Sequence, residues 1–282
     1  MSGLEIGAGD LRLRLFAPGT FYRGTRFDWA GVFDTVTWRG RDLAGRWFDR
    51  YDPTMHDAVC GPAEEFTPIG YGEGETFLKI GVGRLQADDA PYDRFKLYPV
   101  VEPGKRELVV GADTILFRHV MPEYVYEKTV RLLSEDAFTI RHHLEASTLL
   151  KGEVYNHNFF TFGRFRVDAD RRLDFPFTPS GHWRAAYDSV GLAGDGLRFS
   201  RVLEAGESVY MGDLHASGMD GAPYDLTLSD AQAGVSVRIR GDRPLTHTVF
   251  WANHRVACPE PYVAFRAAAG EPFDLEISYF FQ

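Results

Sequence analysis

The sequence has few cysteines, no long apolar run and no excess of positive charge. Of its 282 residues only two are cysteines, Cys60 and Cys258, which lie far apart and in no metal-binding or redox spacing. A disulfide framework is therefore not expected, and both are interpreted as small buried residues in a reducing compartment. The 31 lysines and arginines against 40 aspartates and glutamates give a net charge of -9, which disfavours binding to nucleic acid and to anionic membranes.

Targeting signals and several catalytic motifs are also missing. The first residues, MSGLEIGAGDLRLRLF, carry charges where a signal peptide needs an apolar segment. No later stretch reaches the roughly 18 apolar residues of a membrane span, so we expect a cytoplasmic protein. The sequence has no glycine-rich phosphate loop, no Gly-x-Ser-x-Gly elbow and no dinucleotide-binding fingerprint.

The sequence is rich in apolar residues that alternate with polar ones. Segment 273–281 alternates apolar side chains with Asp274, Glu276 and Ser278, which is typical of a half-buried strand. The same period occurs in segments 11–15, 124–132, 138–144 and 235–240. No window keeps a helical period of 3.6 residues over three turns, and the strand–helix alternation of parallel sheets is missing. The pattern predicts an all-β protein made of large antiparallel sheets, stacked as a sandwich or closed as a barrel.

The composition favours one domain. Hydrophobic residues make up 44% of the chain and aromatic residues 14%, which suffices for one large core, so we expect residues 1–282 to form a single domain. Segment 168–196 is rich in Asp, Pro and Gly, but strand-like segments of similar composition follow it. It is predicted to be a long loop rather than a linker.

Segment 155–160, YNHNFF, places one histidine among asparagines and aromatic residues. In an extended strand His157 shares one face with Tyr155 and Phe159, about 6 to 7 Å from each, and the asparagines point to the other face. This arrangement suits a sugar, because an aromatic ring stacks on the sugar and an imidazole transfers protons near neutral pH. The alternative is a core histidine whose nitrogens are satisfied by backbone or amide groups.

Two segments resemble a known family. Asn156, His157, Phe159 and Phe160 resemble the Asn-His-x-Tyr-Phe-Asn-Leu motif of the aldose 1-epimerases, or galactose mutarotases, with Phe159 in place of the family's tyrosine. Segment 257–261, ACPEP, followed by AGEP at 269–272 and an alternating strand, is similar to the C-terminal pattern of that family. The resemblance is strongest over about 138–162 and 224–282. It implies a galactose mutarotase-like β-sandwich, or supersandwich, in which Glu260 is the catalytic base and His157 protonates the sugar ring oxygen.

The implied chemistry needs only two side chains. Opening a cyclic hemiacetal removes a proton from the anomeric hydroxyl and gives one to the ring oxygen, so a carboxylate and an imidazole on opposite sides of the bond suffice. No cofactor is needed, and the remaining histidines show no metal-ligand spacing, so no metal site is predicted. The alternative for Glu260 is a surface-loop carboxylate between two prolines.

The first half of the chain departs from the family where the substrate binds. By resemblance Arg84 stands for the family's arginine, but the family's second histidine has no counterpart in place. Candidate substitutes are His56 and Glu65, in a segment interpreted as a rim or lid, and Lys79 and Lys96, each of which has the alternative of a solvated surface charge.

An eight-residue segment, YRGTRFDW at 22–29, adds another candidate for substrate binding. Arg26 in this segment could bind a carboxylate or phosphate bidentately, and the alternative is an Arg–Asp pair that braces two strands.

The sequence thus predicts a carbohydrate-active isomerase that resembles aldose 1-epimerase and binds a small sugar or sugar derivative. Two alternatives stay open: a lyase or hydrolase for modified or acidic sugars, suggested by Arg23, Arg26, Lys79 and Lys96, and a sugar-binding protein without catalysis. The particular sugar and the oligomeric state are left open.

Overall fold

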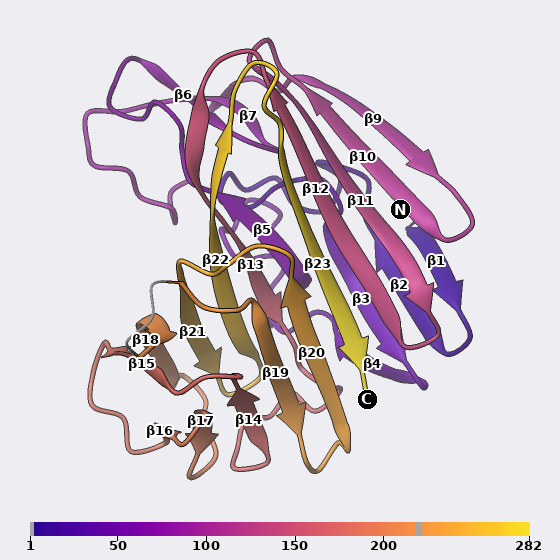
Figure 1. The fold of residues 1–282 in the computed structure, drawn as a ribbon, viewed down its shortest axis with the longest axis vertical. Coiled ribbons are helices and arrows are strands. Elements are labelled where there is room, and N and C mark those ends of the chain that lie inside the picture. Colours follow the sequence, from indigo (N-terminus) through magenta and orange to yellow (C-terminus); the bar gives the residue numbers. More distant parts are fainter. Residues whose placement is uncertain (1–2, 218–220) are drawn as a thin grey trace.

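The computed structural model describes residues 3–217 and 221–282, which form strands joined by loops and turns (Figure 1). The predicted all-β class and β-sandwich are confirmed. Among these residues no helix is long and apolar enough to cross a membrane.

One antiparallel sheet, called the large sheet here, holds ten strands of the described part of the chain. In spatial order they are β16 (Val190–Ala193), β17 (Gly196–Phe199), β14 (Arg171–Asp174), β19 (Asp225–Asp230), β20 (Val235–Gly241), β23 (Phe273–Phe281), β12 (Ala137–Ala146), β11 (Tyr124–Ser134), β10 (Thr114–Val120) and β9 (Lys105–Val110). Figure 1 shows β9 to β12 and β23 running side by side as long strands.

A second antiparallel sheet carries most of the candidate site and is called the site sheet. Its described strands, in spatial order, are β15 (Pro179–Trp183), β18 (Ser208–Ala216), β21 (His247–Asn253), β22 (Ala257–Ala267), β13 (Leu150–Phe159) and β5 (Gly61–Phe66). Two smaller sheets complete the described fold: β1 (Leu4–Ala8), β2 (Leu11–Leu15), β3 (Phe33–Trp38) and β4 (Arg41–Ala44), and β6 (Thr76–Lys79), β7 (Gly83–Gln86) and β8 (Val100–Glu102).

The alternation of β13 explains how one strand serves both the core and the site. Asn158 accepts a hydrogen bond from the Tyr279 hydroxyl on β23, and Asn156 donates one to Glu64, so both amides face the large sheet. His157 and Phe159 point the other way and line a cavity. His157 and Phe159 thus share one face of the strand and the two asparagines share the other, as predicted for YNHNFF.

Two loop predictions are wrong. Segment 168–196 contains β14, β15 and β16 instead of one long loop, and short strands of four or five residues give little periodic signal. Segment 56–66 was expected to form a rim or lid, but its second half is β5, in which every residue is buried. The low apolar content of β5 misled the prediction, because its buried Glu64 and Glu65 are paired with cations.

Candidate active site

The backbone register of the site sheet sets the position of the candidate pair. β13 and β22 are paired from Leu150 with Ala267 to Tyr155 with Tyr262, and beyond that only a single bridge, of Phe160 with Ala257, joins these two segments. The next positions on the same face are His157 and Glu260. Pro259 and Pro261 flank Glu260 and have no N–H to continue the ladder. The pair therefore lies in a gap between the continuous ladder and the bridge of Phe160 with Ala257.

An amide side chain replaces part of the missing ladder. The Nδ2 of Asn158 donates to the carbonyls of Asn156 and Pro259, at 3.0 Å each. This bridge holds β13 against β22 on the core side while His157 and Glu260 meet on the cavity side. Glu260 is therefore neither in a loop nor at the surface, contrary to the alternative considered for it: it lies within β22 and is 3% exposed.

The two candidate catalytic groups touch each other. His157 Nε2 lies 3.2 Å from Glu260 Oε1, whereas the chemistry implied by the family resemblance places the two groups on opposite sides of a sugar bond. The imidazole stacks on Phe159 with 3.9 Å between ring centroids and meets the edge of Phe27 at 5.8 Å. Both groups line a cavity of about 960 Å³ that also has walls from Trp251 and Tyr262. A histidine and a carboxylate are thus in contact within a cavity that is lined by aromatic side chains.

Burial sets the protonation of this pair. It raises the pKa of Glu260 to about 7, although Arg26 and Arg94 lower it. Burial also lowers the pKa of His157 well below its usual value, and the same two arginines lower it further. Below about pH 7 the pair therefore holds one proton, which lies on the carboxyl group while the imidazole is neutral.

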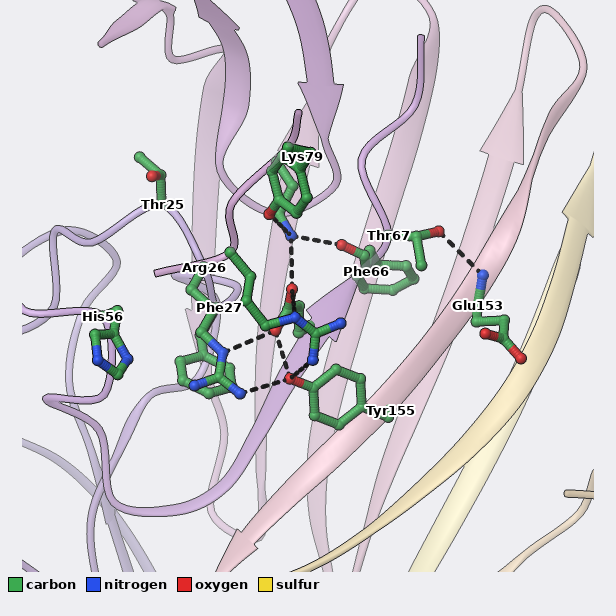
Figure 2. A network of polar contacts seen from close by, with 12 residues as sticks. Thr25, Arg26, Phe27, His56, Phe66, Thr67, Lys79, Glu153 and Tyr155 are labelled. Carbon is green, nitrogen blue, oxygen red and sulfur yellow. Dashed lines mark hydrogen bonds and ion pairs between the residues drawn. The ribbon is translucent and has the colours of Figure 1, made fainter. Parts of the chain in front are cut away.

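Figure 2 shows Arg26, Lys79 and Tyr155 converging in a polar network. The carboxylate that all three contact belongs to the buried Glu65. Arg26 donates from Nε to Glu65 and from Nη2 to the Tyr155 hydroxyl, both at 2.9 Å, and that hydroxyl donates to Glu65. Arg26 is therefore not paired with Asp28, whose carboxylate accepts instead from Tyr126 and from the Ala30 amide.

Lys79 lies in this network and not at the surface. It is fully buried, donates to the Phe66 carbonyl at 2.6 Å and lies 3.4 Å from Glu65. The solvated alternative for Lys79 is thus wrong. Neither Lys79 nor Glu65 is among the cavity-lining residues, so they support the site from beneath.

The remaining candidates divide between the cavity and other places. His56 lines the cavity and packs against Phe95, with 4.8 Å between ring centroids and the rings tilted by 59°. Arg84 lies outside the cavity lining and pairs with Glu102 and Glu123. Lys96 also lies outside it, exposed and paired with Asp88. The structure thus gathers His157, Glu260, Arg26 and His56 and leaves Arg84 and Lys96 apart.

Several lining residues were not found from the sequence. Tyr262 is two residues from Glu260 and would have been placed on its face had segment 257–261 been recognised as a strand. Arg94 lies in the loop between β7 and β8 and reaches the Tyr262 hydroxyl at 3.2 Å. Its one available signal was the aromatic and basic segment PYDRFKLYP at 91–99. In the described part of the chain no group of three or more His, Cys, Asp or Glu side chains is placed to hold a metal ion.

Comparison with solved structures identifies the fold. A GalM/aldose epimerase homologue from C. elegans superposes with a TM-score of 0.57 and 14% identity over 100% of this chain and 98% of that one. A galactose mutarotase related enzyme from Lactobacillus acidophilus gives 0.59 and 10%, over 100% and 97%. The chain has the galactose mutarotase-like fold.

Another similar structure carries no functional name, and two further comparisons found no match. The Slr1438 protein from Synechocystis sp. PCC 6803 gives a TM-score of 0.62 at 14% identity, over 100% of this chain and 96% of that one. No protein-family profile and no curated protein matches the sequence. The galactose mutarotase-like fold does not by itself fix an activity, which depends on the residues of the site.

Proposed function

We propose that this protein is a carbohydrate-active isomerase that interconverts the anomers of a sugar, as an aldose 1-epimerase does. The observation that carries the proposal is the contact of His157 Nε2 with Glu260 Oε1, at 3.2 Å, in the floor of a cavity large enough for a sugar. An acid and a base that share one proton are what the opening of a hemiacetal requires.

The proton movements follow from this contact. The proton that lies on Glu260 in the free protein passes to His157 when the sugar enters, and the ionised carboxylate then accepts the proton of the anomeric hydroxyl. His157 gives its proton to the ring oxygen as the bond between C1 and that oxygen breaks. The product is the open-chain carbonyl form, and closure on the opposite face reverses each transfer. The pair starts and ends with one proton.

The walls of the cavity suit a pyranose ring. Trp251 lines the cavity beside the catalytic pair, with 6.0 Å between its ring centroid and that of His157. Tyr262 also lines the cavity, but its ring stacks on those of Tyr155 and His247, at 4.2 Å each. Aromatic faces bind the C–H face of a sugar while the polar groups receive its hydroxyls. His56 and Arg26 supply such polar groups at the same cavity.

Exchange spectroscopy tests the proposal directly. Saturation-transfer NMR across a panel of aldoses and sugar acids is expected to show faster anomer exchange with the protein than in buffer. Glu260→Gln and His157→Ala are each expected to lower kcat by about 10²-fold or more, since each removes one proton transfer. His182→Ala and Glu204→Gln, at exposed positions, are the matched controls.

The outcome separates the alternatives. No acceleration for any sugar or sugar acid would refute the isomerase. A product that absorbs in the ultraviolet would indicate elimination, and so the lyase alternative. Sugar binding without any turnover would indicate a binding protein.

A further inference from the structure

Three cations surround one buried carboxylate at the edge of the cavity. Glu65 lies 2.9 Å from Arg26, 3.4 Å from Lys79 and 3.8 Å from Arg94. Burial would raise the pKa of Glu65, but Lys79, Arg26 and Arg94 lower it to about 2, so the carboxylate is charged. Burial lowers the pKa of Lys79 to about 8, so it is cationic at neutral pH. The Arg94 side chain is 35% exposed, but Arg26 and Lys79 are buried and already outnumber the single carboxylate. A buried excess of positive charge costs free energy unless an anion binds to it.

Two of these cations have unused donors. Arg26 uses Nε and Nη2, and Arg94 uses Nη1 for the hydroxyls of Tyr155 and Tyr262. Within residues 3–217 and 221–282, neither Nη1 of Arg26 nor Nη2 of Arg94 donates a hydrogen bond to the protein. Both arginines line the cavity, so these donors are available to a ligand.

Other carboxylates of the cavity do not neutralise this charge. Four of them, apart from Glu260, are half-buried or exposed, where water and salt screen them: Asp57, Asp93, Glu153 and Asp213. Glu260 itself is buried, but burial raises its pKa to about 7, so it is only partly ionised at neutral pH. The excess of positive charge is therefore local to the buried end of the cavity.

The position of the arginines relative to His157 indicates where on the sugar the anion sits. Arg26 contacts the hydroxyl of Tyr155, which is two residues from His157 on the same face of β13, about 6 to 7 Å along the strand. In the proposed reaction His157 faces the ring oxygen. That oxygen is bonded to C5, and in a hexuronic acid C5 bears the carboxylate. A ring oxygen at His157 thus directs a C5 carboxylate toward the guanidinium groups.

We infer that the substrate is a sugar acid of the hexuronic type, whose ring carboxylate is bound by the free donors of Arg26 and Arg94. This inference rests on the proposed function and adds the substrate class. Guanidinium groups pair with carboxylates through parallel N–H donors, which gives both affinity and orientation.

Anomer exchange of matched sugars tests the inference. The kcat/KM of the protein is measured for D-glucuronate and D-galacturonate, for D-glucose and D-galactose, and for D-glucose 6-phosphate. At least one uronate is expected to exceed its neutral counterpart about tenfold or more. Arg94→Gln is expected to lower this ratio about tenfold and Arg94→Lys to lower it less. Arg131→Gln, an exposed arginine on β11, makes the same change of net charge and is expected to keep the ratio.

Each other result has a defined meaning. Equal kcat/KM for uronates and neutral hexoses overturns the inference and leaves the proposed function intact. A preference for the phosphate over both uronates also overturns it. If no sugar is exchanged the proposed function fails, and calorimetric titration with D-glucuronate and D-glucose then decides. If D-glucuronate binds and Arg94→Gln weakens that binding, the carboxylate site is supported. If D-glucuronate does not bind, the carboxylate site is refuted.

Discussion

At the scale of single residues, the proton shared by His157 and Glu260 sets the pH dependence. The one-proton state exists below the pKa of Glu260, about 7, and above that of His157, which burial lowers well below the usual value. We therefore expect kcat/KM to be highest on the acid side of neutrality and to fall up to tenfold per pH unit above about 7. Saturation-transfer NMR from pH 4 to 9, corrected for exchange in buffer, measures this profile. A rate that keeps rising from pH 7 to 9 would contradict the shared-proton mechanism.

The buried carboxylate Glu65 makes a separate prediction about stability. Glu65→Gln leaves Arg26 and Lys79 buried without their counter-charge, which is expected to lower the free energy of unfolding by about 3 to 5 kcal/mol. Because its pKa falls from 4.5 to about 2 on folding, its stabilisation is complete above pH 4.5 and is lost as the pH falls toward 2. Urea unfolding monitored by circular dichroism measures both effects.

The control for this substitution is a surface pair. Glu107→Gln removes the exposed partner of Arg118, and its expected cost is below about 1 kcal/mol. The double variant Glu65→Gln/Lys79→Met is expected to recover part of the loss, because it also removes the unpaired ammonium group. A Glu65→Gln variant as stable as Glu107→Gln would show that the buried charges are not coupled as the contacts indicate.

At the scale of strands, the tie between β13 and β23 gives the third prediction. Tyr279→Phe removes the donor to Asn158 Oδ1 and leaves that buried amide oxygen without it, at an expected cost of about 1 to 3 kcal/mol. The cost arises in the core, so kcat/KM is expected to stay unchanged. Tyr51→Phe, at a tyrosine that is 37% exposed, loses a hydroxyl that water can replace and should stay within about 0.5 kcal/mol. Equal losses in urea unfolding for the two variants would contradict this account of the tie.

The strands also show which parts of the structure the sequence makes predictable. Segments 11–15 and 273–281 were predicted as strands and are β2 and β23, since each buries one face only and so alternates clearly. β5 and β22 were missed because β5, and β22 as far as Val263, are buried on both faces and contain prolines. A strand of that kind shows no alternation of apolar and polar residues. Those two strands hold Glu65 and Glu260. Strand prediction from the alternation of apolar and polar residues therefore failed for the strands that carry these two site residues.

At the scale of the whole molecule, predictability depends on how far apart in the chain the interacting residues are. The pairing of His157 with Glu260 was expected only through resemblance, because no local pattern links positions about a hundred residues apart. Arg94 reaches the same cavity from the loop between β7 and β8, whose path depends on tertiary contacts. Local sequence patterns thus pointed to single candidate residues. Which of them lie together depends on the strand register of the site sheet.

The continuity of the core leads to a prediction about the whole chain. One cluster of buried side chains joins Leu13 on β2, Val154 on β13, Leu228 on β19 and Ile277 on β23. We propose that residues 1–282 unfold as one domain, because exposing any part of this cluster removes packing from the rest. Differential scanning calorimetry is then expected to show one transition with equal calorimetric and van't Hoff enthalpies.

Two core substitutions at distant points test that cooperativity. Leu13→Ala and Leu228→Ala, both at fully buried positions, are each expected to lower the free energy of unfolding by about 2 to 5 kcal/mol and to shift the entire transition. Leu149→Ala, at a residue that is 52% exposed, should leave it nearly in place. If Leu13→Ala moves one part of the heat-capacity peak and Leu228→Ala another, the sheets unfold separately. The first four strands would then be a second domain, because the packing of Leu13 would not be coupled to that of Leu228.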